Sequence, residues 1–196
     1  MQLDDIVPWG RSFDEYVAMF DLTADDLGKR ILGCGDGPAA FNAHARARGA
    51  RVISVDPIYA WPAGRIHERI RAVRPIIESE LRREPERCLW ERFRDVDDLI
   101  ETRLGAMDRF LADYAGGHGG QAYVAAQLPQ LPFPGGVFDL ALVSHLLFTY
   151  SKHLSADAHR KAVAELMRVS GEVRLFPLLT LAGTESEHLP AVIDLC

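Results

Sequence analysis

Apolar residues fall into two patterns along the chain, and together these patterns predict a sheet of parallel strands joined by helices. Some apolar runs are short and nearly unbroken, and they are bounded by glycine, proline or aspartate, which is typical of buried strands. Between them, apolar residues recur every three to four positions, which is typical of helices packed on a sheet. We therefore expect a single α/β domain, a three-layer sandwich with a mostly parallel sheet of about five strands. The expected strands lie at residues 30–34, 52–55, 123–126, 140–143 and 171–179.

Two further helical segments extend this core. Ser12 and Glu15 have the spacing of a capping box, which predicts a helix just before the first strand region. Residues 57–120, between the second and third strands, are far longer than one crossover helix requires. Their apolar spacing predicts a helical insertion, in which Pro75 and Pro85 should kink or break the first helix.

A glycine-rich turn follows the first strand, and a carboxylate ends the second. Gly33, Gly35 and Gly37 form the turn, and Asp56 follows 19 residues after the last of them. Strand, glycine turn, helix and strand ending in a carboxylate is the plan of an adenosine-binding βαβ unit. Pro38 stands where a dinucleotide fold has its third glycine, which disfavours a pyrophosphate ligand, and we expect it at the first helical position. The alternative is a tight turn that binds no ligand.

The sequence Gly33-Cys34-Gly35-Asp36-Gly37-Pro38 resembles the first motif of the class I S-adenosylmethionine (SAM)-dependent methyltransferases. A second likeness is the Leu131-Pro132-Phe133 turn that precedes the strand beginning Phe138-Asp139-Leu140. The resemblance implies a Rossmann-like fold with SAM as cofactor. It also implies a leading segment, residues 1–27, that covers the cofactor pocket.

The resemblance implies a set of cofactor-binding residues. Asp56 would accept hydrogen bonds from the ribose hydroxyls, although an aspartate there could simply open the turn before Pro57. Gln127 stands where many members recognise adenine. Ile31 replaces the usual acidic residue, and Arg11 could restore anchoring by pairing with the cofactor carboxylate, or could be a solvated surface residue. The expected cofactor-binding residues are Gly33, Cys34, Gly35, Gly37, Asp56, Pro57, Gln127, Leu128, Ser144, Arg11 and Tyr16.

The methyl acceptor is expected beside the segment that follows the fourth strand. His145 and Tyr150 lie there, and His145 could act as a base with a pKa near neutrality, or could only pack against the cofactor or bond to backbone. The segment has none of the Asn/Asp-Pro-Pro-aromatic motifs of enzymes that methylate nitrogens of bases. A small-molecule acceptor is therefore favoured.

The composition limits the kinds of partner expected for this protein. The net charge of −6 argues against general nucleic-acid binding, and the three cysteines have no spacing that suggests a metal or a disulfide framework. Residues 65–94 are locally basic, with nine arginines and six glutamates, which fits either an anionic ligand or a solvated helix with internal ion pairs. No membrane-spanning or export segment is evident, so a cytoplasmic protein is expected.

Three alternatives to a small-molecule methyltransferase stay open. The first is a SAM- or adenosine-binding module without catalysis, because Ile31 is apolar and the antiparallel strand pair that ends the family's sheet is missing. The second is an RNA methyltransferase that uses the basic insertion, and the third is a nicotinamide-dependent oxidoreductase. An uncovered sheet edge would also favour a homodimer.

Overall fold

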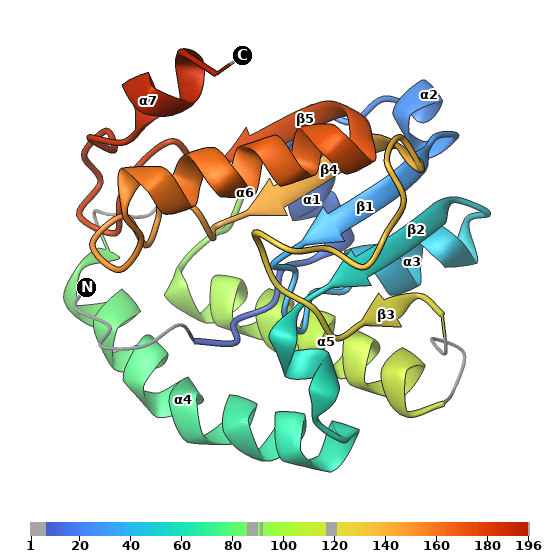
Figure 1. Cartoon of the computed structure of the whole chain (residues 1–196). Coiled ribbons are helices and arrows are strands. Elements are labelled where there is room, and N and C mark those ends of the chain that lie inside the picture. Colours follow the sequence, from blue (N-terminus) through green and yellow to red (C-terminus); the bar gives the residue numbers. More distant parts are fainter. Residues whose placement is uncertain (1–6, 86–89, 91, 117–120, 196) are drawn as a thin grey trace.

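The sheet of the computed structural model has five parallel strands in the order β3-β2-β1-β4-β5 (Figure 1). The structure describes residues 7–85, 90, 92–116 and 121–195. This architecture confirms the predicted α/β sandwich, and no antiparallel strand pair joins the sheet within the described residues. The strands are β1 (Arg30–Cys34), β2 (Arg51–Val55), β3 (Tyr123–Val124), β4 (Phe138–Ser144) and β5 (Ser170–Phe176).

Strand order reverses beside β1, and this reversal creates the site described below. The chain runs from β1 outward to β2 and β3, then returns to place β4 on the other side of β1. Gly33 of β1 is thereby in register with Ser54 of β2 and Leu142 of β4. The carboxyl ends of these strands meet at one edge, which is where open α/β sheets bind ligands.

Each face of the sheet is covered by helices because successive strand residues point to opposite faces. In β4, Leu140 and Leu142 pack with α1 (Phe13–Met19) and α3 (Phe41–Ala47), whereas Ala141 and Val143 pack with α6 (Ala156–Val169). In Figure 1, α6 crosses in front of the sheet and α1 and α3 lie behind it. Because α3 begins at Phe41, the prediction that Pro38 is the first helical residue is wrong.

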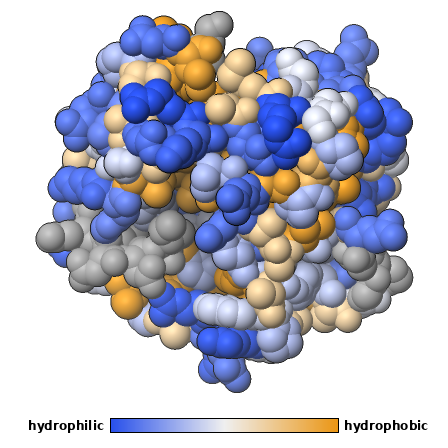
Figure 2. All heavy atoms as spheres, in the orientation of Figure 1, coloured by the Kyte–Doolittle hydropathy of each residue, from blue (hydrophilic) through white to orange (hydrophobic). Residues whose placement is uncertain are grey.

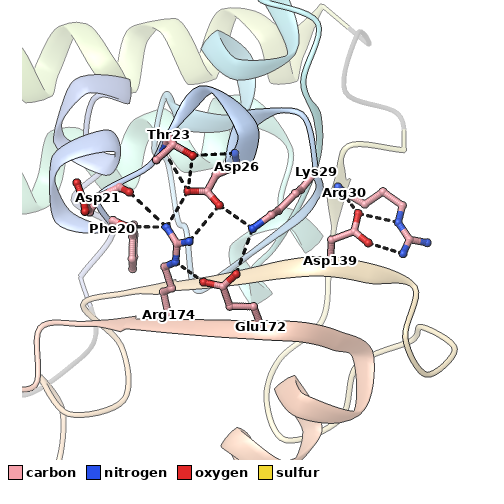
Figure 3. A network of polar contacts seen from close by, with 9 residues as sticks. All are labelled: Phe20, Asp21, Thr23, Asp26, Lys29, Arg30, Asp139, Glu172 and Arg174. Carbon is pink, nitrogen blue, oxygen red and sulfur yellow. Dashed lines mark hydrogen bonds and ion pairs between the residues drawn. The ribbon is translucent and has the colours of Figure 1, made fainter.

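The N-terminal helices are packed into the core. Ser12 and Glu15 form the predicted capping box of α1, and Thr23 and Asp26 form a second one at α2 (Ala24–Leu27). Arg174 of β5 donates to both carboxylate oxygens of Asp26, and Lys29 bridges Asp26 and Glu172 (Figure 3). These contacts fix the α1–α2 region to the edge strand. Of the described residues of the expected N-terminal cover, those that reach the cavity are Val7, Pro8, Trp9, Arg11 and Tyr16.

The described residues of the long connection between β2 and β3 form the helices η1 (Pro57–Ala60), α4 (Ala63–Arg83) and α5 (Val96–Ala115). Helix α4 continues through Pro75, so it is not broken there, and it ends before Pro85. One side of α4 packs on α5 through Ile66, Ile70, Met107 and Phe110.

The basic stretch of the insertion carries internal ion pairs. Arg74 pairs with Glu78, Arg83 with Glu80 and Glu84, and Arg94 with Asp98. The arginines in these pairs are solvent-exposed and face carboxylates of the same segment, as a solvated charged helix does.

Strand β5 is an edge strand, paired in the sheet with β4 alone. Its last residue, Phe176, and the following Leu178 and Leu179 are exposed, and the last helix of the described part is α7 (Leu189–Ile193). Figure 2 shows hydrophobic surface gathered at the end of the molecule where α7 lies, in agreement with the exposure of Ile193. Coverage of this edge by a second copy stays a prediction. Among the described residues, none of the helices has the length and hydrophobicity needed to cross a bilayer.

Candidate functional site

A large cavity lies at the carboxyl ends of β1, β2 and β4. Its volume is about 1180 Å³, which exceeds the roughly 300–1,000 Å³ typical of a site for one small ligand. The glycine turn after β1 forms its floor, and residues of α4 form one wall. The N-terminal segment contributes Val7, Pro8, Trp9 and Arg11, and the end of β4 and the residues after it contribute Ser144, His145, Leu146, Leu147, Thr149 and Tyr150.

The glycines of the turn are required by the packing of the protein itself. A Cβ on Gly33 would lie 1.9 Å from an Asp36 carboxylate oxygen, and one on Gly35 would lie 2.7 Å from Leu146. Gly35 and Gly37 also have φ angles of +70° and +52°, which favour glycine. Gly33 therefore makes room for Asp36 and is not among the residues that line the cavity, whereas Gly35 and Gly37 are.

Asp36 is a buried carboxylate at the floor of the cavity. Its Oδ1 accepts a hydrogen bond from the Tyr16 hydroxyl at 2.8 Å, and its Oδ2 accepts one from the Ser54 hydroxyl at 2.5 Å. Asn42 donates to Ser54 Oγ at 3.0 Å, which leaves the serine hydroxyl hydrogen for Asp36. The carboxylate is thus held by α1 on one side and β2 on the other.

Asp56, directly after β2, ties the glycine turn to the second strand. Its Oδ2 accepts from the Gly37 N–H and its Oδ1 from the Ile58 N–H, each at 2.9 Å. Tyr59 holds the same glycine from the other side by donating to the Gly37 carbonyl at 2.7 Å. The turn-opening role considered for Asp56 is therefore present. A carboxylate offers about four acceptor positions, so two remain for a ligand.

The two carboxylates share an unusual electrostatic position. Neither Asp36 nor Asp56 forms an ion pair with any cationic side chain in the described part of the chain. Burial raises the pKa of Asp36 to about 6, with a smaller contribution from the charge of Asp56, and burial also raises the pKa of Asp56. Next to them, burial raises the pKa of the Cys34 thiol, which therefore stays protonated.

Arg11, from the N-terminal segment, also lines the cavity and lies near the polar groups of Arg103, Glu15 and Tyr16. Burial, together with the charge of Arg103, lowers its pKa to about 9, so that it remains a cation at neutral pH. Arg103 forms an ion pair with Glu15 and donates two hydrogen bonds, of 3.2 and 3.1 Å, to Glu15 Oε1. Arg11 has no such ion pair with a residue that the structure describes. Nearby in the wall, the buried Thr149 hydroxyl also has no hydrogen-bond partner among them.

His145 has a constrained conformation after β4. Its φ is +51°, its N–H donates to the Phe176 carbonyl at 2.6 Å, and its ring Nδ1 lies 3.0 Å from Ser144 Oγ. Burial and the charges of Arg11 and Arg103 lower its pKa far below 6.5. The prediction of a near-neutral pKa for His145 is therefore wrong. The imidazole lines the cavity as a neutral group that is poorly suited to hold a proton.

The structure brings the other predicted residues to the same cavity. Cys34, Pro57, Gln127, Leu128, Ser144, Tyr16 and Tyr150 all line it. The sequence interpretation missed two contributors, Asp36 and Arg103. Asp36 could have been found as the only acidic residue within the glycine turn, whereas Arg103 lies inside a helix of the insertion and carries no local signal. Among the described residues, His, Cys, Asp and Glu form no cluster suited to a metal ion.

These features define an α/β protein with a parallel sheet and a ligand-sized cavity at the point where the strand order reverses. The chain is 32% identical over 194 residues to an uncharacterised protein of Methanocaldococcus jannaschii, MJ0045, and the alignment covers 98% of this chain and 87% of that protein. The chain belongs to the same family as MJ0045. No family model matches the chain. No solved structure matches it either.

Proposed function

We propose that the protein is a SAM-dependent methyltransferase that acts on a small molecule. The observation that carries this proposal is a pair of carboxylates, the buried Asp36 and the partly buried Asp56, at the glycine turn without a cationic partner in the described part of the chain. An uncompensated buried charge is unfavourable, so such a site favours a cationic ligand. SAM carries a sulfonium and an ammonium group.

Other groups of the cavity fit the same cofactor. The free acceptor positions of Asp56 suit two ribose hydroxyls, because a carboxylate forms strong charge-assisted hydrogen bonds. Arg11, which lacks an ion-pair partner among the described residues, suits the cofactor carboxylate. Gln127 and Leu128 suit the adenine, and the cavity volume leaves room for an acceptor beside the cofactor.

When bound, SAM would supply an activated methyl group for in-line displacement by the acceptor. The protein's own contribution would be to orient both ligands and to exclude water. His145 is kept neutral and is held by Ser144 and Phe176, which suits a wall of the acceptor site better than a general base. We therefore expect an acceptor that needs no proton transfer to His145.

The competing functions have weaker support. A dinucleotide would place its pyrophosphate at the glycine turn, where the Asp36 carboxylate would repel it. RNA binding by the insertion is disfavoured because several of its arginines are already paired with carboxylates of the same insertion. A binding module without catalysis shares the proposed cofactor site and differs only in turnover.

Calorimetric titration with SAM, S-adenosylhomocysteine and NADH tests the proposal. We expect micromolar binding of the two adenosyl ligands and none of NADH. Asp56→Ala should weaken both adenosyl ligands by about 100-fold, because two charge-assisted hydrogen bonds are lost. Asp139→Ala, which removes an exposed carboxylate at the other end of the strands, is the matched control and should bind normally.

Failure of the purified chain to bind either adenosyl ligand, or preferential binding of NADH, would contradict the proposal. Binding without methyl transfer to any acceptor in a chemically diverse panel would favour the non-catalytic module instead.

A further inference from the structure

In the part of the chain that the structure describes, the titratable groups that act directly on Asp36 are all acids. Tyr16 faces it from α1, Cys34 from β1, Tyr59 from η1 and Tyr123 from β3, and Asp56 faces it from the turn after β2. Burial raises the pKa of each of these tyrosines and of the thiol, so that they are neutral near pH 7. Among the described residues, Asp56 is thus the one charged group that acts directly on Asp36, and the nearby cation Arg11 acts on its hydrogen-bond partner Tyr16 instead.

Asp36 also has little freedom to escape this environment. Tyr16 and Ser54 each hold one of its carboxylate oxygens, and the residue is 7% exposed. The space that its carboxylate fills exists because Gly33 has no side chain. The charge is thus fixed at the floor of the cavity, where it acts on any ligand bound there.

We infer that Asp36 makes this site distinguish the charge of its cofactor, so that the protein binds sulfonium SAM more tightly than the neutral thioether S-adenosylhomocysteine. The inference rests on the proposed function. In methyl transfer the bond between sulfur and the methyl carbon breaks, a bond from that carbon to the acceptor forms, and the electron pair of the broken bond stays on sulfur. The sulfur thereby loses its positive charge, and the carboxylates lose part of their compensation. Product release would follow from this loss.

The protonation state of Asp36 gives this preference a pH dependence. Because the pKa of Asp36 is about 6, part of the population carries a proton on Asp36 near that pH. A cationic ligand favours the ionised carboxylate, so SAM binding should displace this proton, and affinity should rise as the pH increases from 5 to 8.

The test is calorimetric titration of the full chain with SAM and with S-adenosylhomocysteine at pH 5, 6.5 and 8, in buffers of different ionisation enthalpy that report proton release. At pH 8 we expect SAM to bind about tenfold more tightly, as expected for a unit charge several ångströms from a fixed carboxylate in a partly buried site. The preference should shrink toward pH 5, and proton release should accompany SAM binding near pH 6.

Two variants separate the effect of the Asp36 charge from the effect of its hydrogen bond with Tyr16. Asp36→Asn keeps a side chain of the same size, and it should reduce the preference to about twofold and remove most of its pH dependence. Tyr16→Phe keeps the charge but removes a hydrogen bond to the ionised carboxylate, so that the pH midpoint should move upward while the preference at pH 8 remains.

The outcomes separate the charge preference of the site from the proposed binding of SAM. Equal affinities for both ligands at pH 8, or a preference that Asp36→Asn leaves unchanged, would overturn this inference and leave the proposed cofactor in place. Absence of binding of either ligand would overturn the proposed function itself, and this inference with it.

Discussion

Two groups of carboxylates in this protein have the same chemistry and opposite surroundings. Asp26 of α2 and Glu172 of the edge strand β5 are paired with Arg174 and Lys29 (Figure 3). Hydrogen bonds from these cations and from backbone N–H groups lower the pKa of Asp26 even though its burial opposes this. Asp36, at the glycine turn, has neutral hydroxyl partners instead, and burial raises its pKa.

The difference separates carboxylates that stabilise the fold from a carboxylate whose charge has no cationic partner among the described residues. A paired carboxylate fastens the N-terminal helices to β5 and leaves no charge for a ligand to compensate. An unpaired buried carboxylate costs stability and is tolerated where a ligand supplies the missing charge. The same contrast predicts that mutations in the two groups have opposite effects on stability and binding.

The largest effect should come from Asp26→Ala. The substitution leaves the partly buried Arg174 without its main partner and removes the carboxylate that accepts from the Thr23 backbone N–H in the capping box of α2. We therefore expect the free energy of unfolding to fall by about 3–5 kcal/mol. Urea denaturation measures this loss. Binding of adenosyl ligands by the folded fraction should be unchanged, and a variant of normal stability would show that this network is dispensable.

A second prediction concerns pH. The folded-state pKa of Asp36 is about 6 against 3.8 without the fold, so its contribution to stability is present below pH 4 and is lost as the pH rises through 6. This loss amounts to about 3 kcal/mol at roughly 1.4 kcal/mol per pKa unit. Asp26 has the opposite sign, because its lowered pKa gives stability above about pH 4 that disappears on acidification.

Denaturation of wild type and Asp36→Asn from pH 3 to 8 separates these contributions. The Asn variant should be the more stable protein at pH 8 and should lack the fall between pH 4 and 7. If the free energy of unfolding of the wild type depends on pH as that of the variant does, the ionised Asp36 carboxylate does not destabilise the fold.

An intermediate effect is expected at Gly33. The Cβ of Gly33→Ala would overlap the Asp36 carboxylate, which should lower the free energy of unfolding by about 2 kcal/mol. Combining it with Asp36→Ala should recover much of this loss, since the space is then free. As a control, Gly105→Ala lies in α5 with open space around its Cβ and should stabilise by about 0.5–1 kcal/mol. Simple additivity of the first two changes would contradict this account of the glycine.

The smallest effect should follow from Arg30→Gln. Arg30 and Asp139 form an ion pair near the amino ends of β1 and β4, where both side chains are exposed to solvent (Figure 3). Water screens such pairs, so we expect a Tm close to that of the wild type, and the small difference should decrease further in high salt. Thermal unfolding at two salt concentrations checks this. A large fall in Tm would mean that an exposed ion pair stabilises this fold as much as a buried one does.

Local patterns in the sequence determined most of the architecture. The apolar runs of β1, β2 and β4, the capping box of Ser12 and the glycine turn each depend on residues close together in the chain, so that their signals are readable without the fold. The position of β4 beside β1 followed from the general strand order of such sheets. The continuous α4 shows where local rules fail, because tertiary packing on α5 outweighs the preference of Pro75 to end a helix.

The electrostatics of the site depended on the tertiary structure alone. Asp36 meets Tyr16 and Ser54, which lie 20 and 18 residues away. His145 acquires its low pKa from burial and from the charges of Arg11 and Arg103, which come from the N-terminal segment and the insertion. A pKa reflects burial and every nearby charge, whatever its distance along the chain. The sequence therefore indicated a cofactor turn, and only the folded arrangement revealed that its carboxylates lack positive partners among the described residues.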